Sequence, residues 1–485
     1  MIGALARVLG SLVLVALAAA VAGVALGAWR LARYEQVDDP DALARKAGEL
    51  AWMAQTARAA SAPRPNVVVI LFDDLGLGDL GATGGRLATP RLDALAAEGV
   101  VLEQYAAPAP VCTPSRAGLL TGRWPIRTTL AHVVFPSGHA IDRWQRVRGL
   151  PVRLPSDEIT LAEALRAGGY ATAAIGKWHL GDHAPSRPRD LGFDHWFGAY
   201  YSNDMAPFAL WRNDEVVAPH PVDQTTLTPL YTDEAVRFIE LHRNRRFFVY
   251  VAHNFPHVPL HATPAQRGRS EAGVYGDVVA DLDRSTGEIL DALERLGLAD
   301  ETLVVATSDN GPWFQGSARG LRGRKVEPFE GGLRVPFLAR WPAGFAAGAR
   351  LDAPTSGVDL FPTLLALAGV PLPRDRAIDG TDLGGLLAGG AALPERPLFY
   401  YAERELRAVR IGRWKRFERQ GVAYAALTGL PFAPLFPQGP WLFDLARDPD
   451  ESYDVHEREP DTFARLGGES ERHRAEIGAN PRGWR

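Results

Sequence analysis

The stretch NVVVILFDD, residues 66–74, contains six consecutive apolar residues, four of them β-branched, and ends in two aspartates. Similar strand-like runs follow along the chain, ATAAIG at 171–176, RFFVYVA at 246–252 and TLVVATS at 302–308. Amphipathic segments with helical spacing lie between these runs, at 89–99, 160–169 and 276–297. Continuous apolar strands that alternate with helices are typical of a parallel sheet covered on both faces. The sequence therefore predicts an α/β fold with a large, mostly parallel sheet sandwiched by helices.

The alternation of strands and helices stops after about Pro373, and a different pattern begins. The segments RAVRIGRWKRFE, 407–418, and PWLFDLARDPDE, 440–451, have the composition of strands joined by turns. They predict a small antiparallel subdomain at the C-terminus. We therefore expect a large α/β domain at 66–375 and a small α+β subdomain at 376–485.

The N-terminus contains 22 uncharged residues, Val8 to Trp29, between two arginines. A helix needs about 20 apolar residues to cross a bilayer, so this segment is long enough to span one. The apolar region of a cleaved signal peptide is usually about 7–15 residues long, which favours an uncleaved anchor. We expect residues 1–33 to be a transmembrane anchor or signal segment and residues 34–65 to be a linker that contains a short helix at 41–60. The bulk of the protein is then exported, to the periplasm or another extracytoplasmic space.

The 485-residue chain has 53 basic and 57 acidic side chains and a net charge of −4. This balance excludes a strong basic field, and we expect no nucleic-acid partner. Cys112 is the only cysteine. A disulfide framework and a cysteine-rich zinc site are therefore both excluded.

Polar side chains follow each of the four strand-like runs. In chain order they are Asp73 and Asp74, Lys177 and His179, His253 and His257, and Asp309 and Asn310. In open α/β sheets, ligands bind at the carboxyl ends of the strands. If the four strands are parallel, all of these side chains lie along one edge of the sheet and form one site.

Two of these groups supply oxygen ligands. The carboxylates of Asp73, Asp74 and Asp309 and the amide of Asn310 make a hard donor set, which suits Ca²⁺ or Mg²⁺ and not zinc or copper. An isolated Asp-Asp pair is more often a loop or helix cap. Two acidic pairs, each directly after a buried strand, would repel each other, and a bound cation removes that cost.

Two other groups supply cations and proton carriers. Lys177 and His179 are two residues apart and therefore face the same side of an extended backbone. This pair suits an anionic group, although a surface lysine beside a core histidine would look the same. His257 lies between Pro256 and Pro259, which stiffen the backbone around the imidazole.

The lone cysteine lies in VCTPSRAGLLTGR, residues 111–123. Pro114 suits the first turn of a helix that runs to about Leu120, so Cys112 lies at the N-terminus of that helix. The helix dipole and Arg116 would favour a thiolate nucleophile there. The alternative is a small buried apolar residue, which is the common fate of a lone cysteine.

The motif around Cys112 resembles the signature of the sulfatase family, in which the cysteine is oxidised to formylglycine. The resemblance covers roughly residues 64–455, is greatest to the arylsulfatase branch, and implies an alkaline-phosphatase-like α/β fold. Further segments that match the family in order are NVVVILFDDLG from Asn66, GKWHLG at 176–181, PHVP at 256–259, SDNG at 308–311 and KVEPFEGGLRVP at 325–336.

The resemblance implies a role for each site residue. The implied calcium ligands are Asp73, Asp74, Asp309, Asn310 and the formylglycine at position 112. Arg116 is similar to the arginine that holds the formylglycine, and Lys177 and Lys325 to the lysines that grip the sulfate oxygens. His179 is similar to the histidine that helps release sulfate, and His257 to the one that protonates the leaving alcohol. Ser202 aligns with a serine near the substrate, whereas His253 departs from the usual spacing.

The resemblance thus implies hydrolysis of a sulfate ester, after conversion of Cys112 by a formylglycine-generating maturation enzyme. Two alternatives stay open: a phosphate or phosphonate ester hydrolase of the same superfamily, and a non-catalytic, membrane-tethered binding protein. The former would normally have serine or threonine at position 112. The sequence leaves open whether the ester is aryl, steroid or carbohydrate, because specificity lies in loops such as 132–153, 182–224 and 418–440.

Overall fold

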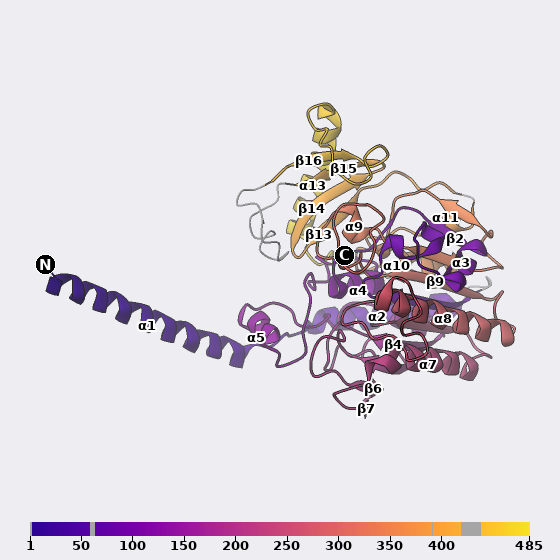
Figure 1. Cartoon of the computed structure of the whole chain (residues 1–485), viewed down its shortest axis with the longest axis horizontal. Coiled ribbons are helices and arrows are strands. Elements are labelled where there is room, and N and C mark those ends of the chain that lie inside the picture. Colours follow the sequence, from indigo (N-terminus) through magenta and orange to yellow (C-terminus); the bar gives the residue numbers. More distant parts are fainter. Residues whose placement is uncertain (1, 59–63, 390, 419–437) are drawn as a thin grey trace.

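The computed structural model describes residues 2–58, 64–389, 391–418 and 438–485 (Figure 1). A ten-stranded sheet forms the centre of the large domain. From one edge to the other its strands are β11 (Ala349–Leu351), β2 (Val100–Leu102), β10 (Phe337–Arg340), β9 (Thr302–Ser308), β1 (Asn66–Phe72), β8 (Phe247–Ala252), β4 (Ala171–Lys177), β5 (His195–Ala199), β6 (Leu210–Arg212) and β7 (Glu215–Ala218).

The centre of this sheet is parallel. Strand β1 pairs in parallel with β9 on one side and β8 on the other, and β8, β4 and β5 continue in the same direction. Strands β10, β6 and β7 join through antiparallel pairs nearer the edges. The prediction of a large, mostly parallel sheet is therefore confirmed at its centre, where the site lies, and the sheet as a whole is mixed.

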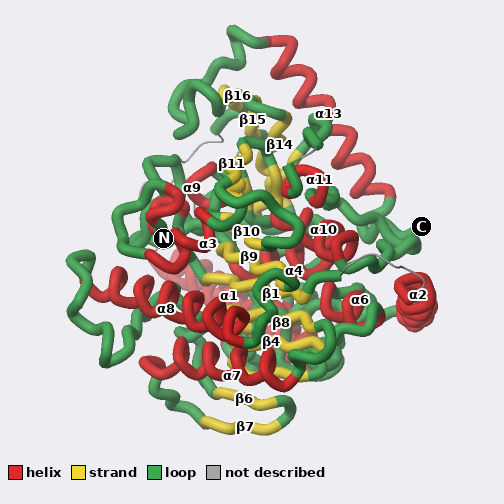
Figure 2. Tube along the Cα trace, turned by 90° about the vertical axis from the view of Figure 1, so that its right-hand side faces the viewer, coloured by secondary structure: helices red, strands yellow, loops and turns green. Residues whose placement is uncertain are grey.

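The continuous apolar sequence of β1 follows from helices on both faces. Alternate residues from Val67 to Leu71 pack into one core, and those from Val68 to Phe72 into the other. The second core is covered by α3 (Pro90–Ala97), α7 (Leu227–Leu241) and α8 (Gly273–Arg295) (Figure 2). The first is covered by α2 (Pro40–Arg58), α4 (Cys112–Thr121), α6 (Leu161–Ala167) and α10 (Leu360–Leu367).

Several short elements complete the large domain. They are α5 (Ala140–Val147), α9 (Glu330–Leu333), α11 (Gly384–Leu387) and a two-stranded sheet of β3 (Tyr105–Ala106) and β12 (Thr355–Ser356).

The C-terminal region forms the small antiparallel sheet that the sequence predicts. Its strands, in spatial order, are β13 (Leu398–Ala402), β14 (Glu405–Ile411), β15 (Trp414–Phe417) and β16 (Trp441–Asp444). Helix α13 (Pro460–Ala479) packs on this sheet. The core of the subdomain includes Phe329 and Leu333 from the large domain, so the two parts share apolar contacts. Most of the predicted specificity loop 418–440 lies outside the described residues.

A buried ion network also joins the two parts. Lys415 on β15 is fully buried and donates to Glu330 Oε1 at 3.0 Å and to the Pro328 carbonyl at 3.0 Å. The same ammonium lies 2.9 Å from Glu451 Oε1. Glu330 belongs to the segment that begins at Lys325, so this network fixes that segment against the small sheet.

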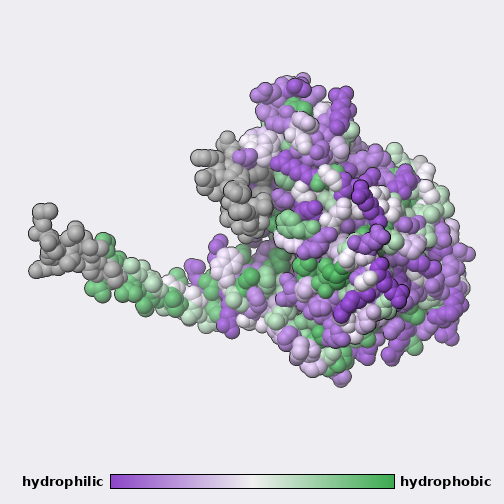
Figure 3. Space-filling model, in the orientation of Figure 1, coloured by the Kyte–Doolittle hydropathy of each residue, from purple (hydrophilic) through white to green (hydrophobic). Residues whose placement is uncertain are grey.

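The N-terminal helix α1 (Ile2–Arg33) extends away from the rest of the protein (Figures 1 and 3). Its segment Leu14–Arg33 has a mean hydropathy of 1.9, is not buried, and is long and apolar enough to cross a membrane. Such a helix near the N-terminus is compatible with a signal sequence or a tether.

The segment predicted as a linker contains the ordered helix α2, apart from residues 59–63, which lie outside the described part. Helix α2 packs against α6 and contributes Met53 and Ala57 to the core. The ion pair between Lys46 and Glu163, at 2.6 Å, adds a further contact. This segment therefore packs as part of the large domain, because its apolar face is buried.

Candidate active site

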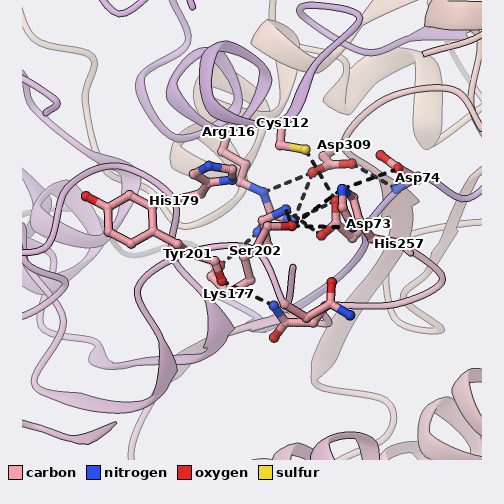
Figure 4. Close-up of polar contacts among 12 residues, drawn as sticks. Asp73, Asp74, Cys112, Arg116, Lys177, His179, Tyr201, Ser202, His257 and Asp309 are labelled. Carbon is pink, nitrogen blue, oxygen red and sulfur yellow. Dashed lines mark hydrogen bonds and ion pairs between the residues drawn. The ribbon is translucent and has the colours of Figure 1, made fainter. Parts of the chain in front are cut away.

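The site lies at the carboxyl ends of four neighbouring parallel strands. Phe72 at the end of β1 is in register with Ser308 at the end of β9, and Gly176 on β4 is in register with Ala252 on β8. The polar residues that follow each strand therefore emerge at one edge of the sheet (Figure 4). This confirms the expectation that segments more than 200 residues apart converge there.

Three carboxylates and the cysteine form the centre of the cluster. Ligand atoms of Asp73, Asp74, Cys112 and Asp309 all lie within 4.8 Å of one another, and all four residues are buried. Asn310 Nδ2 donates to Asp74 Oδ1 at 2.7 Å, while its buried Oδ1 has no hydrogen-bond partner. An unpartnered buried oxygen beside buried carboxylates fits a hard cation such as Ca²⁺ or Mg²⁺.

Each carboxylate also faces a basic side chain. Lys177 Nζ lies 2.5 Å from Asp73 Oδ2, and Lys325 Nζ lies 2.8 Å from Asp74 Oδ1. Arg116 on α4 donates from Nε to Asp309 Oδ2 at 2.9 Å and from Nη1 to the Lys177 carbonyl at 2.8 Å. Three cations thus lie against the carboxylate cluster, an arrangement that suits an anionic group beside a metal ion.

The electrostatic environment shifts the pKa values of Asp73 and Asp309 in opposite directions. Burial alone would raise the pKa of Asp73, but Lys177, His257 and Arg116 hold it well below its usual range. Burial, together with the negative charge of Asp73, raises the pKa of Asp309 to about 6. The cost of burying these charges is therefore only partly balanced by the protein's own cations.

Cys112 is the first residue of α4, as the sequence predicts, and its Sγ lies 3.4 Å from Asp73 Oδ1. Burial raises the pKa of the Cys112 thiol, although Lys177 and Lys325 act in the opposite direction. The environment therefore does not favour the thiolate nucleophile considered from the sequence. A thiol with a raised pKa is a poor nucleophile, so catalysis at this position needs another chemical group.

His179 is fully buried beside the cluster. Its Nε2 lies 3.0 Å from the Val134 carbonyl and therefore donates to it, which leaves Nδ1 unprotonated and without a partner. Burial, with the charges of Lys177 and Arg116, lowers its pKa well below the usual value. The imidazole is thus neutral and has a free proton-accepting nitrogen.

His257 lies on the opposite side, with Nε2 3.8 Å from Asp74 Oδ2. Its Nδ1 donates to the Val258 carbonyl at 2.5 Å. The Ser202 hydroxyl lies 3.4 Å from His257 Nδ1 and accepts a hydrogen bond from Lys177 Nζ at 3.1 Å. Burial lowers the pKa of His257, and the positive charge of Lys325 lowers it further.

The structure brings together every site residue named from the sequence, including Ser202. It leaves His253 outside: that ring stacks on Phe72 and its Nε2 lies 3.3 Å from Ser285 Oγ on α8. Two features of the site had no signal in the sequence. One is the Val134 carbonyl, which fixes the tautomer of His179, and the other is Tyr201, whose ring meets His179 edge-on at 5.7 Å.

Comparison with known proteins identifies relatives of this site. A family model described as Sulfatase matches residues 65–370, and one described as the C-terminal region of aryl-sulfatase matches residues 393–483. Mouse N-acetylgalactosamine-6-sulfatase is 38% identical over 441 residues, covering 81% of this chain and 83% of the relative. Human steryl-sulfatase is 32% identical over 504 residues, covering 81% and 84%.

Solved structures agree with these matches. The PsFucS1 sulfatase from Pseudoalteromonas sp. superimposes with a TM-score of 0.75 at 26% identity, covering 92% of this chain and 96% of that one. The phosphonate monoester hydrolase of Agrobacterium radiobacter shares the fold, with a TM-score of 0.60 at 22% identity, covering 85% of this chain and 96% of that one.

Proposed function

We propose that this chain, which belongs to the sulfatase family and hydrolyses sulfate esters, does so with a formylglycine made from Cys112 and a bound divalent cation. The observation that supports this most is the convergence of Cys112 with three buried carboxylates whose ligand atoms lie within 4.8 Å of one another. The CTPSR sequence at 112–116 supplies the maturation-type motif. A formylglycine-generating enzyme is therefore the maturation partner.

The proposed metal ligands are Asp73, Asp74, Asp309, Asn310 and the converted residue 112. Calcium is the first choice and magnesium the alternative, because every protein ligand is an oxygen. A cation there supplies Lewis-acid stabilisation of negative charge on the sulfate oxygens. The unpartnered Oδ1 of Asn310 supports its inclusion among the ligands.

Residue 112 supplies the nucleophile, and basic side chains bind the sulfate group. Formylglycine, once hydrated, supplies two hydroxyls on one carbon, one of which is the nucleophile. Lys177 and Lys325 bind the sulfate oxygens, and their charges offset the charge that develops during S–O cleavage. Arg116 is held rigidly by Asp309 and by the Lys177 carbonyl, and it orients residue 112.

Two histidines move protons on opposite sides of the site. The Nδ1 proton of His257 is held by the Val258 carbonyl, so the ring acts as the acid in its doubly protonated form, which the nearby Asp74 carboxylate favours. It then donates the Nε2 proton to the oxygen of the departing alcohol. His179 accepts a proton at Nδ1, which is unpartnered because Nε2 is committed to the Val134 carbonyl. This acceptor serves the release of sulfate from residue 112.

The substrate class within sulfate esters is tested by a screen of aryl, steroid and carbohydrate sulfates with wild type and Cys112→Ala. We expect turnover of at least one class by wild type and its loss in the variant. The first alternative, a phosphate or phosphonate ester hydrolase, predicts faster turnover of those esters by the same preparation. The second, a non-catalytic binding protein, predicts metal binding without turnover of any ester.

The apolar N-terminal helix supports the proposed membrane anchor and export of the rest of the chain. We assign residues 1–33 as a membrane anchor, 66–375 as the catalytic domain and 376–485 as the C-terminal subdomain; α2 and α11 lie outside the bounds 66–375 but pack into the core of the catalytic domain. The catalytic domain is exported to the periplasm or another extracytoplasmic space. Retention of the helix is tested by the intact mass of the membrane-bound protein. A mass that lacks the first residues would identify a cleaved signal instead.

A further inference from the structure

Helix α5 buries two polar side chains and exposes two large apolar ones. Asp142 and Gln145 are buried, whereas Ile141 is 40% and Trp144 53% exposed. The buried residues are held by hydrogen bonds: Gln145 Nε2 donates to the Val133 carbonyl at 2.7 Å, and Asp142 Oδ2 accepts from the Gly138 amide at 2.9 Å. A surface helix normally has the opposite arrangement, so the outer face of α5 calls for an apolar partner.

The position of α5 identifies that partner. The helix lies beside the end of α1 (Figure 1). Tyr34, the residue after α1, donates from its hydroxyl to the Leu150 carbonyl at 2.7 Å, and Arg146 lies 5.2 Å from the Tyr34 ring. If α1 spans a bilayer, α5 lies at the level where the chain leaves the membrane.

The charges around α5 fit an anionic surface. Arg143 and Arg148, on the outer side of α5, make no ion pair within the described part of the chain, and Arg148 lies 5.2 Å from the Trp144 ring. Arg30 and Arg33 in the last turn of α1 are likewise without an ion pair there. A groove of about 530 Å³ between Leu31 and α5 is lined by Arg143 and by Arg146, which is paired with Asp142 at 2.8 Å.

We propose that the outer face of α5, with Trp144 at its centre, docks onto the interface of a bilayer that contains anionic phospholipid. Trp144 and Ile141 enter the boundary between headgroups and acyl chains, and the arginines contact lipid phosphates. This docking rests on the proposed membrane anchor. It gives the catalytic domain a second membrane contact, which fixes its orientation relative to the bilayer.

The test uses the full chain in lipid nanodiscs with an environment-sensitive fluorophore at single introduced cysteines. Trp144→Cys reports docking, Leu26→Cys in α1 reports the anchor, and Leu241→Cys at the far end of α7, where Leu241 is 69% exposed, is the matched control. Cys112 is buried, and the wild-type chain treated in parallel gives its background labelling. Retained sulfatase activity shows that each variant is folded.

We expect shallow spin-labelled lipid to quench the probes at residues 26 and 144 by about twofold or more and to leave the probe at 241 unchanged. Quenching at 26 without quenching at 144 would overturn the docking and leave the anchor intact. No quenching at either position would overturn both, and equal quenching at all three would show nonspecific adsorption.

The lipid charge is tested in the same system. Quenching at residue 144 should increase when phosphatidylglycerol replaces part of the phosphatidylcholine, and the double variant Arg143→Glu/Arg148→Glu should abolish that increase. Quenching that is independent of lipid charge would overturn the assignment of an anionic surface.

Discussion

Lys325 Nζ lies 2.8 Å from Asp74 Oδ1 and 2.9 Å from Asp74 Oδ2, which joins two segments 251 residues apart in the sequence. Burial alone would lower the pKa of Lys325, but Asp74 raises it above the usual value. The lysine therefore keeps its charge in a buried site. A permanent cation at this position can serve both proposed roles, binding a sulfate oxygen and offsetting the charge of Asp74, a proposed metal ligand.

Residue 112 should be modified in the active protein. Peptide mass spectrometry after co-expression with a formylglycine-generating enzyme should show that the thiol sulfur has been lost at this position. Cys112→Ala should fold but lose nearly all turnover, because alanine cannot be converted to the aldehyde. An intact thiol in a fully active preparation would contradict this prediction.

Asp309→Ala should reduce both bound metal and turnover. The substitution removes one carboxylate ligand and also leaves Arg116 without its acceptor at 2.9 Å. Elemental analysis of purified protein measures the metal, and Asp283→Ala serves as a control because Asp283 bonds to backbone amides of α3 outside the site. Active wild-type protein without calcium or magnesium would show that the ligand assignment is wrong.

Loss of His257 should harm poor leaving groups most. An alkyl or sugar alcohol with a high pKa needs a proton during S–O cleavage, whereas nitrophenolate departs with little help. General acid catalysis is worth about 10²–10⁴-fold, so His257→Ala should show a steeper dependence of kcat/KM on leaving-group pKa than wild type. Parallel slopes would mean that His257 only orients the substrate. His179→Ala is the contrast, since its defect should depend little on the alcohol.

Replacing Lys415 should destabilise the protein without removing a group from the active site. Lys415→Met leaves the buried Glu451 without its counter-ion, while Glu330 keeps Arg334 at 2.6 Å, and removing one partner of a buried pair costs about 3–5 kcal/mol. Unfolding in urea measures the change. Arg447→Met removes an 81% exposed cation from the same subdomain and should have little effect. Equal stability of the two variants would show that the network contributes nothing.

His473 should make the C-terminal subdomain sensitive to acid. Burial and, to a smaller extent, the positive charge of Arg127 lower the pKa of His473 to about 4 in the folded protein. In the unfolded chain the imidazole takes up a proton near its ordinary pKa of 6.5. The folded state favours a neutral imidazole, so the stability that the ring contributes is fully present above pH 6.5 and is lost as the pH falls towards 4. At pH 5 the loss amounts to about 2 kcal/mol.

The variant His473→Phe keeps an aromatic ring against Phe399, whose ring centroid lies 3.7 Å from that of His473. Its unfolding midpoint should fall less than that of wild type between pH 7.5 and pH 5. An identical fall in both proteins would assign the acid sensitivity to other groups.

The sequence predicted the parallel centre of the sheet because β1, β4, β8 and β9 are continuous apolar runs of a kind that surface strands do not have. The ends of these apolar runs also located the site, since Asp73 and Asp309 follow two neighbouring strands. The edge strands β6 and β7 were missed because they are short and half-exposed. Helix α2 was predicted as a helix but was placed in a linker, since its few buried residues, such as Met53, do not stand out among its many polar ones.

Other features of the site depend on contacts that no local pattern encodes. The tautomer of His179 is set by the backbone carbonyl of Val134, and any residue type would supply that carbonyl. Lys177, His257 and Arg116 lower the pKa of Asp73, whereas burial and the charge of Asp73 raise the pKa of Asp309, and no local pattern encodes these neighbours. The link between Lys415 and Glu330 joins side chains 85 residues apart, one on strand β15 and the other on helix α9.

The burial of Cys112 has a consequence for the order of events during biosynthesis. The motif that surrounds this residue is contiguous, and an enzyme can bind it in an unfolded segment of chain. The carboxylates around it meet only after β9 has been synthesised, almost 200 residues later, and the thiol is then only 2% exposed. If Cys112 is converted to formylglycine as proposed, the maturation enzyme has to act in the interval between synthesis and folding. A chain that folds first would be trapped as a stable, inactive protein, so the rate of folding would set the fraction of active molecules.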